Sequence, residues 1–439
     1  MEHRTNRWIT TRAALVVAAL ALTLLVGLGG CGAGTGDHKV VLIGIDGMDW
    51  QIVDPLLEAG KLPNIRSLID RGVRANLRSI GPEMKSPIIW TCIATGKTQR
   101  KHGISDFLQE QTGEQALYNS RGWKALAVWQ MLGDAGRTVG VINWWLSWPA
   151  YPVNGFLITE RITFTAEDGY PDIPEVTTPP ELAEELAPFC QPVSTLPDDE
   201  LAPFLVGDSW RTTDDHTVSD GRESIRGIHA MDKTILQVTN HMLETHDQPD
   251  FFATYFQGLD VTCHRYWGQW DTTSVDMYMT PEMIRTYSEL IPRYYEYIDS
   301  AVGQIIDRMD EDSTVIICSD HGFRGPYRSP RGLLLGIWMH RQTGVLIAAG
   351  PGIEPSNETL DASVFDITPT VLALLGEPVA RDMDGFVLTE ILDDDFEAAN
   401  PVTYVDTYER EPAASGEAPE TEEVDDAIRE KLRSLGYIE

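Results

Sequence analysis

Seven residues, far apart in the sequence, have side chains that could bind two metal ions and attack an ester. Three are aspartates, three are histidines and one is a serine: Asp46, Ser86, Asp260, His264, Asp320, His321 and His340. Carboxylate oxygens and imidazole nitrogens are typical ligands of zinc-like ions, which in catalytic sites keep an open position for substrate. A hydroxyl held beside such an ion can act as a nucleophile near neutral pH. The set therefore predicts a metal-dependent site.

Short apolar runs that alternate with helical patterns predict an α/β fold, with a mainly parallel sheet and helices on both faces. The expected strands are Lys39–Ile45, Thr138–Asn143, Phe251–Phe256 and Thr314–Cys318, and the expected helices are Pro63–Asp70, Trp123–Ala135, Ile225–Leu243 and Tyr294–Met309. Asp46, Asp260 and Asp320 follow strand ends. Because ligand sites in open α/β sheets gather outside the carboxyl ends of strands, these carboxylates should converge.

The order of the local sequences resembles the alkaline phosphatase superfamily, in its branch of type I phosphodiesterases and nucleotide pyrophosphatases. The resemblance rests on five segments spread over about residues 38 to 390: IDGMD, KSP with the later ATGK and HGI, LDVTCH, SDHGF with a downstream histidine, and FDITPTVLALLGEPVARDMDG. It implies an alkaline-phosphatase-like fold and two divalent ions, expected to be Zn²⁺. The implied ligands are Asp260, His264 and His340 for one ion, and Asp46, Asp320 and His321 for the other.

The resemblance also implies a reaction. Ser86 would bridge to the second ion as the nucleophile and form a phosphoseryl intermediate on a small phosphorylated substrate, either a phosphodiester or a nucleotide. Pro87 favours a helix start, so we expect Ser86 at the N-cap, where the helix supplies positive potential for a phosphoryl oxygen. Nucleotide pyrophosphatases usually have Asn where this chain has Ile89. Thr91 or Lys97 could substitute for the missing amide.

Other functions on the same core stay open. They are a phosphomonoesterase, a phosphonate hydrolase and a headgroup transferase. A sulfatase needs Cys or Ser in a Cys/Ser-x-Pro-x-Arg context, whereas Ser86 is followed at once by Pro87 and has no Arg four residues on. A non-enzymatic lipoprotein would have no reason to keep all seven candidate residues.

The first thirty residues resemble an export signal. Three arginines precede the apolar run Ala13–Leu28, and small residues then lead to Cys31. The pattern resembles a bacterial lipobox, which implies a signal peptide over 1–30, lipidation of Cys31 and a flexible tether over 31–37. We therefore expect an exported protein anchored by lipid to a bacterial membrane. An uncleaved membrane anchor is the alternative, although the run is short for a span of roughly 20 residues.

Length and charge limit the remaining possibilities. Residues 38–400 are enough for one catalytic domain with a cap inserted at about 160–245, and 401–439 should be an acidic, disordered tail that ends in a short amphipathic helix. The formal net charge is −33, which argues against nucleic-acid binding. The five cysteines show no spacing typical of a disulfide framework.

For several other residues we favour a structural role over a functional one. Asp49 should cap a helix rather than support a metal ligand, His102 should be structural, and Arg161 should be a surface residue rather than a phosphate contact. An aromatic cluster is expected to pack in the core, with the wall of an apolar leaving-group pocket as the alternative. Its members are Trp144, Trp145, Trp148 and Tyr151.

Overall fold

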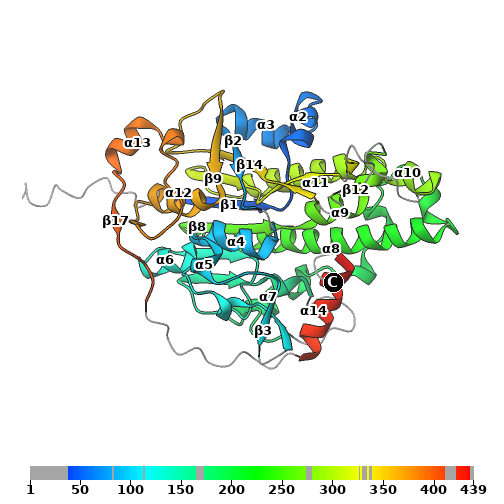
Figure 1. Ribbon diagram of the computed structural model, residues 1–439, viewed down its shortest axis with the longest axis horizontal. Coiled ribbons are helices and arrows are strands. Elements are labelled where there is room, and N and C mark those ends of the chain that lie inside the picture. The colour runs from blue at the N-terminus through cyan, green and yellow to red at the C-terminus, as the bar shows by residue number, and fades with distance from the viewer. Residues whose placement is uncertain are drawn as a thin grey trace, which may run out of the picture. The chain divides into compact units, whose positions relative to one another are not determined.

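A mixed sheet of nine strands runs through the described part of the structure, which is a computed structural model (Figure 1). In spatial order the strands are β15 (Thr359–Ser363), β2 (Gly72–Arg78), β14 (Thr343–Ala349), β9 (Ser313–Cys318), β1 (Lys39–Ile45), β8 (Phe251–Phe256), β5 (Val139–Ile142), β6 (Gly155–Ile158) and β7 (Thr177–Thr178). Only β14 and β7 run antiparallel to their neighbours. The mainly parallel sheet of the predicted fold class is therefore confirmed.

The structure describes residues 38–81, 84–111, 114–164, 173–272, 279–325, 327–328, 334–335, 339–410 and 422–435. All of them belong to one compact unit, His38–Glu439. The expected signal peptide, Cys31 and the tether lie outside the described residues. Within the described residues, no helix combines the length and the apolar character needed to cross a membrane.

Helices cover the sheet in two groups whose members contact one another. The first group is α2 (Trp50–Glu58), α3 (Pro63–Asp70), α8 (His216–Thr245), α9 (Gly258–Trp270), α10 (Pro281–Tyr287) and α11 (Leu290–Ile306). The second is α4 (Ser86–Thr95), α5 (Gln99–His102), α6 (Val128–Asp134) and α12 (Ile367–Leu374). The central strands β1, β8 and β9 are buried almost throughout, as expected for parallel strands covered on both faces.

The predicted strands match the sheet closely, while three predicted helices differ in extent. Helix α11 begins four residues before the expected Tyr294 and ends three residues before the expected Met309. The helix expected from Trp123 begins only at α6, because Gln130 reaches back to accept the N–H of Ala127 (2.9 Å) and fixes the first turn there. Conversely, α8 starts nine residues before the expected Ile225. Its start is capped by Asp215, whose carboxylate accepts the N–H of Thr217 (2.9 Å).

The segment expected to form a cap contains β7, α7 (Leu182–Leu186), several short 3₁₀ turns and all of α8. Helix α8 packs against β8, α9 and α11, so this end of the segment is part of the protein core. Whether the segment shapes a substrate pocket stays a prediction.

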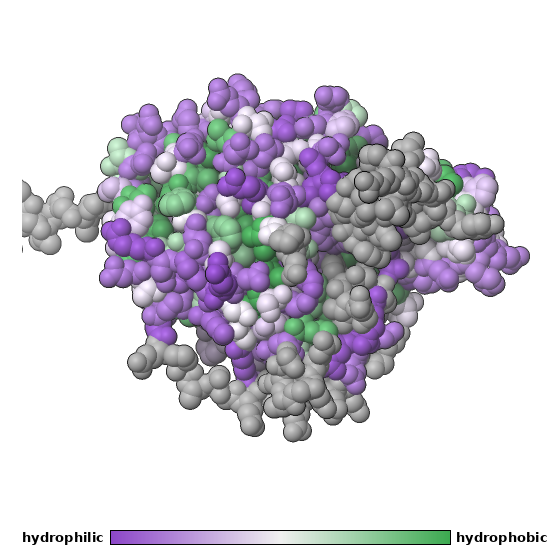
Figure 2. Space-filling view, in the orientation of Figure 1, coloured by the Kyte–Doolittle hydropathy of each residue, from purple (hydrophilic) through white to green (hydrophobic). Residues whose placement is uncertain are grey.

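The C-terminal part of the chain returns to the body. Strand β17 (Tyr404–Val405) pairs with β16 (Val379–Ala380), within the stretch expected to begin the tail. Helix α13 (Asp394–Ala399) precedes it, and α14 (Glu422–Leu435) lies where a terminal helix was expected. On the face drawn in Figure 2, hydrophilic residues predominate among those described, in keeping with the acidic composition.

Candidate metal centre

Three adjacent parallel strands bring the predicted carboxylates to one edge of the sheet. Strand β1 lies between β8 and β9. Asp46 follows β1, Asp320 follows β9, and Asp260 lies in the first turn of α9, which follows β8. The Asp46 N–H donates to the carbonyl of Phe256 (2.9 Å), which fixes the end of β1 against the end of β8. All three aspartates are fully buried, so the expected convergence is found.

One group of ligand atoms surrounds the Asp260 carboxylate. His264 lies one helical turn after Asp260 on α9, and its Nε2 is 3.3 Å from Asp260 Oδ1. His340 comes from β13 (Met339–Arg341), which pairs with β10 (Gly322–Arg324). His340 Nε2 lies 3.6 Å from Asp260 Oδ1 and 2.9 Å from His264 Nε2. These three side chains are close enough to share one ion.

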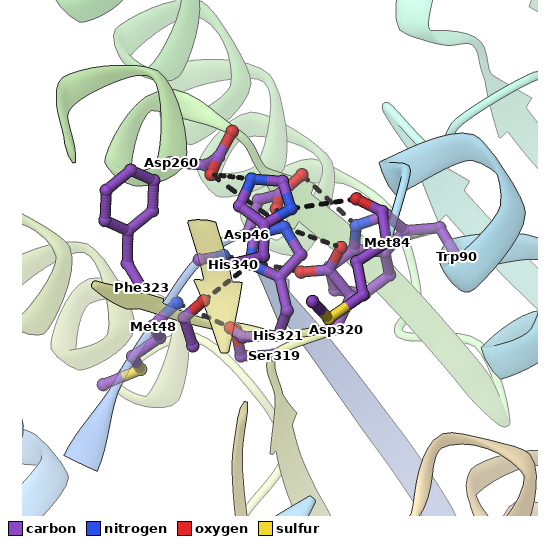
Figure 3. A network of polar contacts seen from close by, with 12 residues as sticks. Asp46, Met48, Met84, Trp90, Asp260, Ser319, Asp320, His321, Phe323 and His340 are labelled. Carbon is purple, nitrogen blue, oxygen red and sulfur yellow. Dashed lines mark hydrogen bonds and ion pairs between the residues drawn. The ribbon is translucent and has the colours of Figure 1, made fainter. Parts of the chain in front are cut away.

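A second group meets at His321. Its Nε2 lies 3.3 Å from Asp46 Oδ1, 3.4 Å from Asp320 Oδ2 and 3.9 Å from Asp260 Oδ1. Asp46, Asp260 and His321 could share an ion, and Asp320 adjoins them. The two groups are contiguous, since the His321 and His340 rings stack with centroids 3.6 Å apart. Figure 3 shows these residues facing one another across the ends of the strands.

Hydrogen bonds to carbonyl groups orient two of the imidazoles. His340 Nδ1 lies 2.9 Å from the carbonyl of Met84, and His321 Nδ1 lies 3.1 Å from the carbonyl of Gly322. Because a carbonyl can only accept, each Nδ1 carries the proton. Each Nε2 therefore presents its lone pair to the cluster, as a metal ligand must.

The electrostatics of the cluster favour added positive charge. Burial, followed by the Asp260 charge, raises the pKa of Asp46 to about 7. Burial and the Asp46 charge raise the pKa of Asp320 well above its ordinary value. Burial acts to raise the pKa of Asp260, but the attraction to His264 and a hydrogen bond with it outweigh burial, so this pKa lies below its ordinary value. Burial lowers the pKa of His321 and His340, so these imidazoles are neutral.

The cluster fits divalent cations. Within the described residues, Asp46 Oδ1, Asp320 Oδ2 and His321 Nε2 are buried and make no hydrogen bond. Buried polar atoms without such a bond cost stability, so three of them at one point call for an ion or water. Cations would also hold Asp46 and Asp320 ionised by reversing the upward shift of their pKa. The mixed Asp and His ligand set suits Zn²⁺.

Ser86 lies beside this cluster at the start of α4. The structure places Lys85 at the N-cap and Ser86 one position later, which corrects the expected N-cap role by one residue. Ser86 is buried and close enough to lower the pKa of Asp46, yet its Oγ completes no hydrogen bond of normal geometry among the described residues. Lys85, the residue before Ser86, pairs with Asp106 (2.5 Å).

Neither expected substitute for the missing amide faces the site. The Thr91 hydroxyl donates to the carbonyl of Pro87 in its own helix (2.6 Å). Lys97 is buried elsewhere and pairs with Asp382 (2.9 Å) and Glu409 (2.6 Å). Two residues that the sequence analysis did not select bind Asp46 Oδ2 instead: the Tyr255 hydroxyl (2.5 Å) and the Trp90 indole N–H (3.3 Å).

Asp49 does more than cap a helix. Its carboxylate accepts the N–H of Gln51 at the start of α2 (2.8 Å), as predicted. It also accepts the N–H of Phe323 on β10 (2.9 Å) and two bonds from Arg341 on β13 (2.8 and 3.0 Å). Asp49 thus joins α2 to both strands of the hairpin that carries His340. Its spacing from Asp46 was the only sequence signal for this role.

His102 and Cys263 belong to neither ligand group. His102 is buried against the Cys92 sulfur (3.3 Å), consistent with the structural role expected for it. Cys263, beside His264, is buried, and burial raises the pKa of its thiol well above the ordinary value, so it stays protonated. The cysteines of the described part, which are Cys92, Cys190, Cys263 and Cys318, are all free thiols.

Comparisons with known proteins point to one family. Residues 40–363 match the family described as type I phosphodiesterase / nucleotide pyrophosphatase. A stretch of 124 residues is 32% identical to the choline-sulfatase of Rhizobium meliloti, but it covers 26% of this chain and only 24% of that enzyme.

A solved structure supports the fold. The chain is similar to a 2-O GAG sulfatase, with a TM-score of 0.52 and 12% identity over 84% of this chain and 76% of that one. Human ectonucleotide pyrophosphatase / phosphodiesterase 5 is similar at a TM-score of 0.48 and 12% identity, over 81% of this chain and all of that one (100%). At 12% identity the likeness to the sulfatase concerns the fold alone.

Proposed function

Because the chain belongs to the type I phosphodiesterase / nucleotide pyrophosphatase family, within the alkaline phosphatase superfamily of hydrolases, we propose that it hydrolyses phosphoric diesters with Ser86 as the nucleophile. The observation that carries the proposal is the position of Ser86. Its buried hydroxyl lies at the start of α4, beside a cluster of carboxylates and imidazoles that fits divalent cations.

The proposed ligands fall into the two groups described above. Asp260, His264 and His340 would hold one Zn²⁺, and Asp46, Asp320 and His321 would hold the other. When bound, such ions polarise phosphoryl oxygens and lower the pKa of a nearby hydroxyl. Asp260 belongs to the first group and also lies next to His321 of the second group. Its carboxylate would therefore keep the two groups at a fixed spacing.

The chain's own residues orient the attack. The positive end of the α4 dipole favours a phosphoryl group in front of Ser86. Tyr255 and Trp90 donate to Asp46 Oδ2, which leaves Oδ1 turned toward His321. The attack transfers the phosphoryl group to Ser86 Oγ and expels the alcohol of the ester. Water then hydrolyses the phosphoseryl intermediate and restores the hydroxyl.

A diester preference follows from what surrounds Ser86. Ile89 is buried and apolar where an amide would contact a phosphoryl oxygen, so the site offers less support to a doubly charged monoester. The net charge of −33 also disfavours highly charged substrates.

Sulfate-ester hydrolysis is the second candidate, favoured by the partial identity to choline-sulfatase. The residues around Ser86 argue against it. Trp90 stands where a sulfatase needs Arg, and its indole is turned to Asp46. A sulfate ester in the substrate panel below tests this alternative directly.

Replacing Ser86 tests the proposal. Ser86→Ala should lower turnover of bis(p-nitrophenyl) phosphate by several orders of magnitude and leave zinc content unchanged, because the ligands lie on other segments. Ser67→Ala, at an exposed position of α3, is the matched control. The panel should compare a diester, a monoester, a phosphonate and a sulfate ester. Near-full activity of Ser86→Ala would refute the phosphoseryl mechanism, and a monoester preference would refute only the diester part.

We also propose that the enzyme is exported and anchored by lipid on Cys31. The basic residues, the apolar run and the small residues before Cys31 support this proposal. Wild-type protein should partition with membranes in the bacterium that makes it, and Cys31→Ala should be released or remain unprocessed. Unchanged partition and unchanged size of the variant would refute lipidation.

A further inference from the structure

We propose that a cavity beside the metal centre binds the leaving group of the substrate, an apolar chain or ring that carries a negative charge, and that α14 occupies this site in the present structure. The inference rests on the proposed function, because it names the substrate class of the same site. We call the space the leaving-group cavity. Its apolar walls include Phe107, Trp145, Leu146 and Phe164, and Ile428 and Leu432 of α14 close it.

The cavity adjoins the metal centre through three connections. Gln257, which lines it, directly precedes the helix that carries Asp260. The indole N–H of Trp145 donates to the Tyr255 hydroxyl (2.6 Å), which in turn donates to Asp46. Phe107, which lines the cavity, follows Asp106, and Asp106 pairs with Lys85 at the start of α4. By these connections, a group that leaves Ser86 would enter this space.

Volume indicates that α14 fills the site rather than forming one wall of an open pocket. Ligand pockets usually measure about 300–1,000 Å³. With α14 in place, the cavity retains only about 50 Å³, too little for an organic group. Ile428 and Leu432 are buried there, with 6% and 5% of their surface exposed. Their side chains thus take the space that a ligand would need.

Arg161 identifies the charge of the ligand. It was expected at the surface, but it is buried, with 4% of its surface exposed, and it lies over the Trp148 ring at 3.4 Å from the centroid. Its Nη2 pairs with Asp425 of α14 (2.9 Å), while Nη1 has no hydrogen-bond partner within the described residues. The Glu160 carboxylate also lines the cavity, where it accepts hydrogen bonds from Ser147 (2.8 Å) and the N–H of Trp148 (3.0 Å). The unused Nη1 donor of Arg161 therefore suits an anionic group that also takes the place of Asp425.

Helix α14 displays the same chemistry that we infer for the ligand. It presents apolar side chains to the cavity and a carboxylate to Arg161, at positions 425, 428 and 432 on one face. Figure 1 shows α14 at the C-terminal end of the described chain. An anionic amphiphile would compete with Asp425, Ile428 and Leu432 for the same partners. The helix therefore inhibits the site until such a ligand displaces it.

Binding of a fatty acid anion tests the inference without turnover. Calorimetry should compare octanoate with acetate on the zinc-loaded Ser86→Ala protein, since both carboxylates could meet the metal ions equally. Ile428→Ala combined with Leu432→Ala should tighten octanoate binding about tenfold, because displacement no longer costs the burial of two large side chains. Acetate affinity should not change. Arg161→Gln in the same background should abolish the gain.

Controls separate this result from damage to the fold. Asp426→Asn with Glu430→Gln, on the exposed face of α14, should leave octanoate affinity unchanged. Asp425→Asn alone should tighten binding by a smaller factor, which keeps a test available if the double variant misfolds. Octanoate binding that is no tighter than in the parent protein, both with Ile428→Ala combined with Leu432→Ala and with Asp425→Asn, would overturn the inference. Binding of octanoate to the wild type that does not compete with a diester substrate would also overturn the inference. If octanoate behaves as expected while Ser86→Ala stays active, only the proposed function fails.

Discussion

At the scale of single residues, Asp49 shows how one buried carboxylate can support a metal site from outside the ligand set. Besides the three segments its side chain joins, the backbone N–H of Asp49 donates to the Tyr295 hydroxyl (3.1 Å), so its position is fixed from α11 as well. Close packing adds to this constraint, because a side chain at Gly322 would collide with the Asp49 carboxylate. The hairpin that carries His340 is therefore held at one distance from Asp46.

Removing this carboxylate should weaken metal binding. We expect Asp49→Ala to lower zinc affinity by about 10–100-fold, the usual effect of losing a partner that orients metal ligands. Calorimetric titration of the metal-free protein measures this affinity. Asp54→Ala is the control. Asp54 also lies on α2 and pairs with an arginine, Arg74 (2.8 Å), but this pair is away from the site. Equal zinc affinity for Asp49→Ala and wild type would exclude the supporting role.

The ligand residues could be identified from their types and the local sequence around them, whereas their supporting contacts could not. IDGMD and SDHGF mark strand ends, and parallel strands bring such ends together whatever the other details. Tyr255 and Trp90 contact Asp46 from a different strand and from a helix. Each has the pattern of an ordinary core residue, because its partner is set by tertiary packing alone.

At the scale of elements, the start of α9 is held by two neighbouring helices. Asp232 of α8 accepts the N–H of Gly258 (3.2 Å) and the hydroxyl of Tyr294 on α11 (2.8 Å). A side chain at Gly258 would collide with both partners, so only glycine permits this close approach. Because Asp260 lies two residues later, the contact fixes the turn that presents it.

This contact should make stability depend on pH. Burial raises the pKa of Asp232 to about 7, from an ordinary value of 3.8. Its contribution to the free energy of unfolding is therefore complete below about pH 4 and is lost as the pH rises toward 7, by at most about 1.4 kcal/mol per pH unit. Asp232→Asn should lack this loss, as urea unfolding between pH 4 and 8 would reveal. Asp220→Asn, exposed on the same helix, should follow the wild type. Parallel curves for wild type and Asp232→Asn would contradict the assignment.

The elements also show where sequence patterns stop being informative. The strands were predictable because runs such as Phe251–Phe256 are apolar throughout, which a strand buried on both faces requires. Helix ends were less predictable. The starts of α6 and α8 are set by single side chains, Gln130 and Asp215. Neighbouring polar residues could form the same kind of capping bond, so the sequence does not show which residue caps the helix.

At the scale of the molecule, the candidate metal centre joins segments that are distant in the chain. Its ligands come from the ends of β1 and β9, from α9 and from β13. The overall strand order and the position of α14 could not be read from the sequence, because both depend on contacts between residues hundreds of positions apart. Bound ions would link these segments, so metal binding should raise the free energy of unfolding of the whole domain.

Removal of metal should therefore destabilise the protein as a unit. An ion that binds only the folded state contributes about 4 kcal/mol when its concentration is 1,000 times its Kd. Without cations, Asp46 and Asp320 would be buried close together near His321 with no compensating charge, which adds to the loss. We expect excess chelator to lower the Tm of zinc-loaded protein by several degrees, and added Zn²⁺ to restore it. His264→Ala should show a smaller shift, because one ligand is already gone, while Ser86→Ala should match the wild type. A Tm that chelator leaves unchanged, with metal loss verified by elemental analysis, would mean that the ions play no part in holding these strand ends together.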